Sequence, residues 1–151
     1  MGNHYCFVCG PDNPRGLHVQ FTRKGQYGAT ARFFVEKEMA GWPTIQHGGI
    51  TSTLLDEACA YVPTYMDKIT VTAELNVLFK SPVRVGETLV IEAEPLRITR
   101  KLILVHATLH NEEGELKAEA TAKMMVLSDD QRHQMGMGPE VMNLLSTEQP
   151  S

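Results

Sequence analysis

The chain has 151 residues, of which 42% are hydrophobic and 21% charged, with 14 Lys and Arg against 18 Asp and Glu. This is the composition of one ordinary folded domain, and a net charge of −4 without a strongly basic stretch argues against binding to nucleic acid or to an anionic membrane. No apolar run approaches the roughly 18 residues of a membrane span, and the first residues lack a signal-peptide core. We therefore expect a cytoplasmic protein.

The three cysteines are expected to be reduced thiols, because their odd number and the missing secretion signal argue against a disulfide framework. Cys6 and Cys9 form a C-x-x-C pair, with His4 and His18 close by, which raises the alternative of a zinc knuckle. A second C-x-x-C or an H-x-x-x-H is missing. We therefore expect no metal, and interpret the pair as small residues that pack an N-terminal flap, residues 1–16, onto the domain.

The middle of the chain begins with two short strands and continues with one helix. Residues 17–22 and 30–35 are strand candidates joined across a glycine-containing turn, which predicts a hairpin. From Gly48 to about Tyr61, apolar residues recur at spacings of four, four and three, and Pro63 should end the pattern. Because this helix contains few charges, we expect it to be buried on most sides.

Four further strands are predicted over 71–79, 88–94, 101–111 and 115–127, each with one apolar and one mostly polar face. A turn of the sequence Asn-Glu-Glu-Gly joins the last two. Six strands, mostly joined by hairpins and interrupted by one apolar helix, predict an α+β fold in which a curled antiparallel sheet wraps around one central helix. We expect a single domain over 1–151, in which 128–151 forms short helices and a tail.

The segment that carries chemistry is the start of the predicted helix. Gly48 and Gly49 permit close approach of a ligand, and the first N–H groups of a helix have no intrahelical partner, so this end suits an anion or a developing oxyanion. Asp56 follows two turns later in apolar company, about 100° around the helix from Glu57. The alternatives are a solvated or salt-bridged Asp56 and a His47 that only caps the helix.

This segment resembles a known family. A His-Gly-Gly motif followed by a helix with an acid nine positions after the His is similar to the hotdog-fold acyl-CoA thioesterases of the PaaI type, within the 4-hydroxybenzoyl-CoA thioesterase superfamily. The strand 71–79, followed by Lys-Ser-Pro and a Gly-containing turn, resembles the strand that follows the family's helix, and the opening 6–17 resembles the start of one branch. The resemblance covers roughly residues 5–127 and implies the hotdog fold.

The resemblance also implies roles for individual residues. Asp56 matches the catalytic acid, acting as nucleophile or as general base on water. Gly48 matches the residue whose backbone N–H polarises the thioester carbonyl, and Thr72 matches a hydroxyl residue that positions the water or the acid from across a subunit interface. His47 matches the motif histidine near the carbonyl, and the adjoining Gly49 is expected to contact substrate.

One position departs from the family pattern. Several members that act on aromatic acyl groups have Asn or Gln six positions before the motif His, where this chain has Gly41. We expect Gln46 to contact the substrate, and its side-chain amide is one candidate for the second carbonyl donor. The acyl group itself and the carrier, CoA or acyl carrier protein, are not indicated by the sequence.

The expected substrate is an acyl-CoA, with CoA as part of the substrate and no cofactor. Three cations, Arg97, Arg100 and Lys101, cluster at a predicted turn of an acidic chain and are expected to bind the CoA phosphates; the alternative is a solvated turn. An edge strand and the expected role of Thr72 predict a homodimer or homotetramer. The competing functions are a non-catalytic acyl-CoA binding or sensing domain and, less in keeping with the motif order, an acyl-CoA hydratase or dehydratase.

Overall fold

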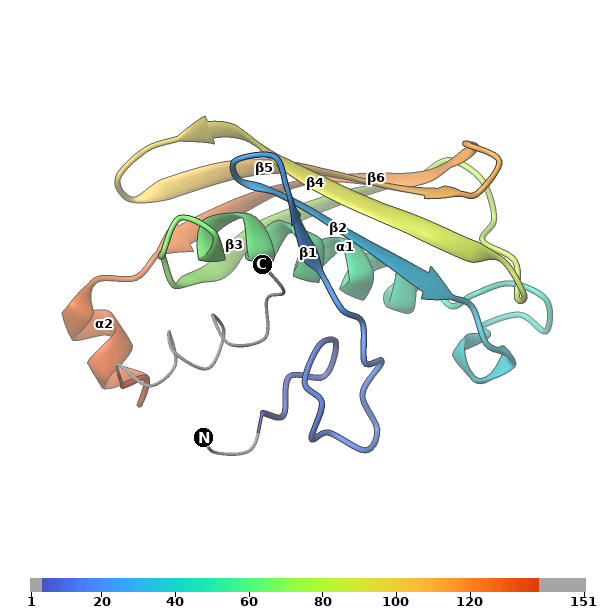
Figure 1. Cartoon of the computed structure of the whole chain (residues 1–151), viewed down its shortest axis with the longest axis horizontal. Helices are drawn as coiled ribbons and strands as arrows, with labels where there is room; N and C mark the ends of the chain where they lie inside the picture. Colours follow the sequence, from blue (N-terminus) through green and yellow to red (C-terminus); the bar gives the residue numbers. More distant parts are fainter. Residues whose placement is uncertain (1–3, 139–151) are drawn as a thin grey trace.

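The computed structural model describes residues 4–138, which form a six-stranded antiparallel sheet curled around one long helix (Figure 1). This is the α+β architecture that the sequence predicts. The elements in chain order are β1 (Thr22–Lys24), β2 (Gly28–Phe34), a 3-10 helix (Lys37–Met39), α1 (Gly48–Thr64), β3 (Thr70–Phe79), β4 (Thr88–Ile98), β5 (Leu102–Asn111), β6 (Leu116–Val126) and α2 (Asp129–Gln134).

The order of the strands in the sheet is β1-β2-β4-β5-β6-β3, and every neighbouring pair is antiparallel. Tight turns join β4 to β5 and β5 to β6, and the second of these contains Gly114 at a φ of 85°, a conformation that favours glycine. β3 pairs only with β6 and so forms one edge of the sheet. An edge strand leaves backbone N–H and C=O groups available to another chain.

The core lies between α1 and the inner face of the sheet. Every second residue of β5, from Ile103 to Leu109, is buried there, as the predicted alternation requires. Burying one leucine side chain contributes about 2 kcal/mol to the free energy of unfolding. The fully buried side chains of α1 include Leu54, Leu55, Ala58, Cys59 and Val62.

The N-terminal segment lies across the side of α1 that faces away from the sheet (Figure 1). The N–H of Leu17 donates to the carbonyl of Phe7, and the N–H of Val19 donates to the carbonyl of Val8, both at 2.8 Å. Because residues 17–19 bond to the flap in this way, the predicted strand 17–22 is wrong in its position, and β1 begins only at Thr22. The sheet thus covers one side of the apolar helix, and the flap covers the other.

Two prolines lie inside elements that were predicted to stop before them. The helix passes Tyr61 and includes Pro63 in its last turn before it ends at Thr64, which removes only one intrahelical hydrogen bond. β4 extends four residues beyond its predicted end, to Ile98, and its register with β5 shifts immediately after Pro95. A β-bulge at this point accommodates the missing N–H of the proline.

The described C-terminal part is α2, which begins with a capping box at Ser128. The rest of the segment that was predicted to form short helices and a tail, residues 139–151, lies outside the described residues. Within 4–138, no helix combines the length and the apolar character that crossing a bilayer requires.

Candidate functional site

The start of α1 presents one free backbone donor. His47 is the N-cap residue, and its ring Nδ1 accepts the N–H of Gly49 at 2.8 Å. The N–H groups of Ile50 and Thr51 both donate to the His47 carbonyl. Of the first four N–H groups of the helix, only that of Gly48 has no partner within the described part of the chain. His47 therefore caps the helix, as one of the two alternatives for this residue expected. Because the His47 ring accepts the Gly49 N–H, that N–H is not free to bind a substrate.

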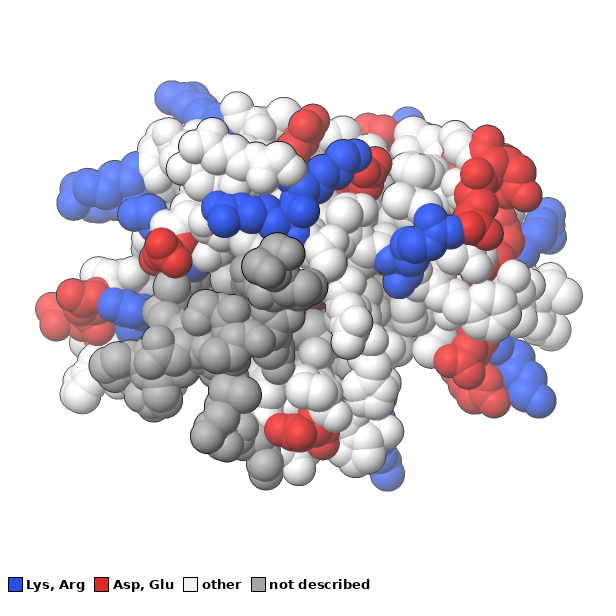
Figure 2. All heavy atoms as spheres, in the orientation of Figure 1, with Lys and Arg blue, Asp and Glu red and all other residues white. Residues whose placement is uncertain are grey.

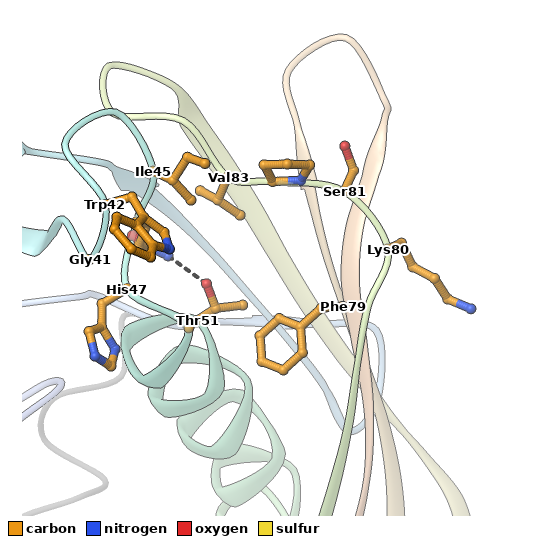
Figure 3. A pocket seen from close by; sticks show the side chains of 12 residues that line it. Gly41, Trp42, Ile45, His47, Thr51, Phe79, Lys80, Ser81 and Val83 are labelled. Atoms are coloured by element: carbon orange, nitrogen blue, oxygen red, sulfur yellow. Dashed lines mark hydrogen bonds between the residues drawn. The ribbon is translucent and has the colours of Figure 1, made fainter.

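An apolar pocket of about 820 Å³ adjoins this helix end (Figure 3). Its walls come from the loop before α1, the first turn of α1, the end of β3 and the segment that follows β3. Two aromatic side chains at the pocket are unusually exposed, Trp42 at 77% and Phe79 at 59%. In Figure 3 the His47 ring points away from the space between Thr51 and Phe79. The lining residues are Gly41, Trp42, Ile45, Gln46, His47, Gly48, Thr51, Phe79, Lys80, Ser81, Pro82 and Val83.

Gln46 is a buried polar residue in the wall of this pocket. Its side chain is only 3% exposed, and its Nε2 donates to the hydroxyl of Thr51 at 2.9 Å (Figure 3). Its Oε1 is buried without a hydrogen-bond partner among the described residues. A buried polar atom without a partner costs about 1–3 kcal/mol, so Gln46 retains an unused capacity for hydrogen bonding beside the pocket.

A buried lysine fixes the far wall of the pocket. Lys117 was predicted on the polar face of its strand, yet it is 3% exposed, and its Nζ donates to the carbonyl of Pro82 at 2.9 Å. The same ammonium lies 3.3 Å from Glu87 Oε1 and 3.0 Å from Glu115 Oε1. Partial burial raises the pKa of Glu87, but hydrogen bonds from the Arg84 N–H, Asn111 and Lys117 lower it below its usual value overall.

The predicted catalytic acid and hydroxyl meet at the edge of the sheet. The hydroxyl of Thr72 donates to Asp56 Oδ1 at 2.7 Å, from β3 to the middle of α1. Thr72 was expected to reach the acid from another subunit; this is corrected, because the two residues meet within one chain. The register of β3 with β6 shifts next to Thr72, so a local irregularity of the edge strand accompanies the contact.

The structure separates the predicted site into two groups. Gln46, His47 and Gly48 line the pocket, but Asp56 and Thr72 do not. Eight helical positions separate Gly48 from Asp56, which corresponds to about 12 Å along the axis. A donor and a base that act on one carbonyl must each be within about 3 Å of the reacting atoms. The two groups of one chain therefore cannot serve the same thioester.

The predicted phosphate-binding cations lie at the opposite end of the molecule from the pocket, around the turn between β4 and β5 (Figure 1). Arg100 and Lys101 line a hollow of about 520 Å³ together with Lys68, which the sequence analysis did not single out; Arg97 lies on β4 and does not line it. All three predicted cations are exposed. On the face shown in Figure 2, basic and acidic side chains are interspersed.

Glu57 was expected to face different surroundings from Asp56, and it does. Its Oε2 lies 3.2 Å from the sulfur of Cys6, and the two groups share a hydrogen bond on the side of α1 covered by the flap. Burial, together with the charge of the Cys6 thiolate, raises the pKa of Glu57 to about 8. Sequence reasoning missed this contact, although the C-x-x-C pair and a carboxylate on an apolar helix were visible signals.

A family model and one curated relative both identify thioesterases as similar to this chain. The thioesterase superfamily matches residues 44–118. A Rattus norvegicus protein, acyl-coenzyme A thioesterase THEM4, is 25% identical over 114 residues, or 75% of this chain and 49% of the relative. An uncharacterized Schizosaccharomyces pombe protein is 33% identical over 64 residues, or 41% of this chain and 37% of the relative. The chain thus spans about half or less of the length of these curated relatives.

Solved structures share the fold, which is the hotdog fold of thioesterases. The Escherichia coli PaaI protein from the phenylacetic acid degradation operon has a TM-score of 0.71 at 20% identity, over 74% of this chain and 81% of that protein. A hypothetical thioesterase of Streptococcus pneumoniae, solved with coenzyme A, has a TM-score of 0.69 at 19% identity, over 73% and 89%. That protein was also solved with an aspartate-to-alanine and a threonine-to-alanine substitution 16 positions apart, the separation of Asp56 and Thr72 here.

Proposed function

Because the chain belongs to the thioesterase superfamily, we propose that it hydrolyses acyl-CoA thioesters to the free acid and the thiol, in a site built from two chains. The observation that carries this proposal is the 2.7 Å hydrogen bond that Thr72 donates to Asp56 on an edge strand. It joins a carboxylate and a positioning hydroxyl at a surface where a second chain can bring the missing donor.

The distance between the two groups of residues supports a site between chains. In a dimer with a two-fold axis, each contact between residue i of one chain and residue j of the other occurs twice, so each chain contributes the same residues to its partner's site. Two antiparallel α1 helices can place Gly48 of one chain beside Asp56 of the other, which removes the separation of about 12 Å that one chain imposes. The unpaired edge of β3, which carries Thr72, is the natural contact between the copies. The active form is then a homodimer, or a tetramer made of such dimers.

The chemistry assigns each group a step. The N–H of Gly48 donates to the thioester oxygen, and an aimed donor of this kind is typically worth about 10²–10³ in rate. The Thr72 hydroxyl occupies Asp56 Oδ1 and thereby orients the carboxylate, whose Oδ2 faces either water, as a general base, or the carbonyl carbon, as a nucleophile. In the first route Asp56 takes a proton from the attacking water; in the second the carboxylate forms a mixed anhydride, which water then hydrolyses to the free acid and Asp56. In both routes the carrier leaves as a thiolate, and the proton that water releases balances its protonation.

The pocket beside Gly48 suits an apolar acyl group. Its walls carry Trp42 and Phe79, two exposed aromatic side chains that a bound acyl chain would cover. Gln46 can supply the second donor, because the Thr51 hydroxyl can donate as well as accept. A half-turn of the amide would satisfy its buried Oε1 from Thr51 and free its NH₂ for the thioester oxygen.

The same antiparallel arrangement places the basic end of one chain near the pocket of the other. The β4–β5 turn lies toward the C-terminal end of α1, whereas the pocket lies at the N-terminal end (Figure 1). The partner's Arg100 and the partner's Lys101 are therefore proposed to bind the CoA phosphates, together with the partner's Lys68. If replacing Arg100 and Lys101 by Ala leaves KM for acyl-CoA unchanged, this placement is wrong.

The direct test of activity is release of free thiol from a panel of short, branched, aromatic and long-chain acyl-CoAs, read with a thiol reagent. Turnover by the wild-type chain, lost in Asp56→Asn, is the expected result. Acyl-CoA binding without release of thiol from any member of the panel would contradict hydrolysis and identify a non-catalytic binding domain.

A further inference from the structure

Three side chains with metal-binding donors meet between the flap and α1. The sulfur atoms of Cys6 and Cys9 and a carboxylate oxygen of Glu57 all lie within 4.8 Å of one another. Cys6 and Cys9 come from the turn of the flap, and Glu57 comes from the helix. This is the only such group among the described His, Cys, Asp and Glu residues. It lies on the side of α1 that the flap covers, about 100° around the helix from Asp56, and its residues have no part in the proposed hydrolysis.

The backbone of the flap holds both sulfurs on one side of a tight turn. The N–H of Cys9 donates to Cys6 Sγ at 3.4 Å, and the N–H of Gly10 donates to the Cys6 carbonyl at 2.9 Å. A Cβ at Gly10 would lie 2.4 Å from the Cys6 nitrogen, so only glycine fits there. Donation of an N–H to sulfur stabilises a thiolate, the form that binds metal.

The charge of the surroundings also leaves room for a cation. The two thiols and the carboxyl group lie together in a partly buried space between the flap and α1. No Lys or Arg forms an ion pair with any of the three within residues 4–138.

From this arrangement we infer that Cys6, Cys9 and Glu57 bind a thiophilic divalent cation of the Zn²⁺ class. Two thiolates and one carboxylate are ligands that zinc accepts, whereas Mg²⁺ and Ca²⁺ require oxygen donors. Zn–S and Zn–O bonds of about 2.3 and 2.1 Å in a tetrahedral site separate the two donors by about 3.6 Å. Cys6 Sγ and Glu57 Oε2 are 3.2 Å apart, so they need to move only slightly.

The position of the cluster indicates its purpose. The cation joins the flap to α1 at the residue next to Asp56, and so fixes the cover on the helix that carries the proposed catalytic acid. Three protein ligands leave one tetrahedral position for water. Metal binding by residues far apart in sequence stabilises the folded chain, because the unfolded chain does not hold this set of ligands together.

The test uses the tag-free full chain, reduced and freed of metal, and titrates it with Co²⁺ followed by Zn²⁺. We expect one Co²⁺ per chain, a thiolate-to-cobalt charge-transfer absorption, and complete displacement by Zn²⁺. The double variant Cys6→Ser/Cys9→Ser should lose this absorption. Each single variant keeps one thiolate, so it should show a weaker absorption and bind more weakly by more than the roughly 10–100-fold that loss of an outer-shell partner costs. Glu57→Gln should keep the absorption but bind more weakly.

Cys59 provides the matched control, because it is a free cysteine on the same helix, fully buried and outside the cluster. Cys59→Ala should bind Co²⁺ as the wild-type chain does. Two results would overturn the inference: a folded, reduced wild-type chain that shows no charge-transfer absorption with Co²⁺, or an absorption of wild-type intensity in the double serine variant. The first of these needs no variant, so a failure of the variants to fold leaves the test intact.

Discussion

Asp56 and Glu57 are neighbours on one helix, yet they belong to different parts of the molecule. Asp56 turns to the edge strand, where the Thr72 hydroxyl donates to its carboxylate. Glu57 turns to the flap, where it meets two cysteines. One step along a helix rotates a side chain by about 100°, and this rotation separates a proposed catalytic carboxylate from a proposed metal ligand. An acid in an apolar helix is therefore identified by what it faces, more than by its neighbours in sequence.

The largest effect should come from removing the charge of Asp56. Asp56→Asn keeps the size of the side chain but removes the base or nucleophile, so kcat for acyl-CoA should fall by at least about 10². Steady-state release of thiol measures it. Glu119→Gln on β6, whose carboxylate makes no ion pair among the described residues, is the control and should retain kcat. A wild-type kcat for Asp56→Asn would mean that the acid has been misassigned.

A smaller loss of kcat is expected when Thr72, the donor of the hydrogen bond to Asp56, is replaced. Thr72→Ala removes the hydroxyl that orients Asp56 but leaves the acid in place. A hydrogen bond to a charged group is worth about 1.5–3 kcal/mol, and about 1.4 kcal/mol is tenfold in rate, so kcat should fall by about tenfold or somewhat more. Thr72→Ser restores a hydroxyl and should recover most of the rate. A serine variant as slow as the alanine variant would argue for a packing role.

Glu57 should affect stability more than turnover. With Zn²⁺ at 100 times its dissociation constant, the wild-type chain should gain about 2.7 kcal/mol in the free energy of unfolding, and Glu57→Gln should lose most of this gain. Thermal unfolding with Zn²⁺ and with a chelator measures the difference. The contact with Cys6 means that Glu57→Gln is not a neutral control for Asp56→Asn, as the sequence alone would suggest. An equal gain in stability with Zn²⁺ in the wild-type chain and in Glu57→Gln would contradict the role of Glu57 as a metal ligand.

The smallest effect concerns Glu87, a carboxylate whose pKa is shifted opposite to that of Glu57. Its pKa is below the ordinary 4.5, so the folded chain binds fewer protons there than the unfolded chain. The stability that results is present above about pH 4.5 and is lost as the pH falls through the folded-state value. In Glu87→Gln, stability should therefore fall less steeply below pH 4.5, as measured by denaturant unfolding. An unchanged slope would contradict a lowered pKa of Glu87 in the folded chain.

Periodicity predicted most of the fold. The alternation in β5 and β6 and the apolar spacing of α1 required a sheet wrapped around a helix, and that is the observed arrangement. The errors fall at prolines and in the flap. Pro63 lies in the final turn of α1, where it removes only one hydrogen bond, and Pro95 lies where the register of β4 with β5 shifts, so neither proline ends its element.

The site was predicted less completely, since it depends on contacts between distant residues. The family resemblance predicted roles for Gly48, Asp56 and Thr72, which stay predictions, and nothing in the sequence showed that Thr72 reaches Asp56 within one chain. Burial of Lys117 could not be read from a strand that alternates as if the lysine were exposed. The cluster of Cys6 and Cys9 with Glu57 joins residues about 50 positions apart, a separation that no local pattern spans.

The central claim, a site shared between chains, is tested most directly by mixing two inactive variants. Gly48→Pro removes only the free N–H, because proline is accepted at the first helical position and His47 has the extended ψ of 132° that precedes a proline. Gly48→Ala keeps the N–H, and its Cβ would make an ordinary contact with Phe79 at 3.6 Å, so it is the matched control and should retain much more activity.

Gly48→Pro and Asp56→Asn chains, each inactive alone, are unfolded together and refolded as a mixture. If each site takes Gly48 from one chain and Asp56 from the other, half of the dimers are mixed, and each mixed dimer has one intact site. The account predicts that about a quarter of the wild-type rate of thiol release returns at a 1:1 ratio. No recovery, in a mixture shown to contain mixed dimers, would contradict it and place both groups in the site of a single chain.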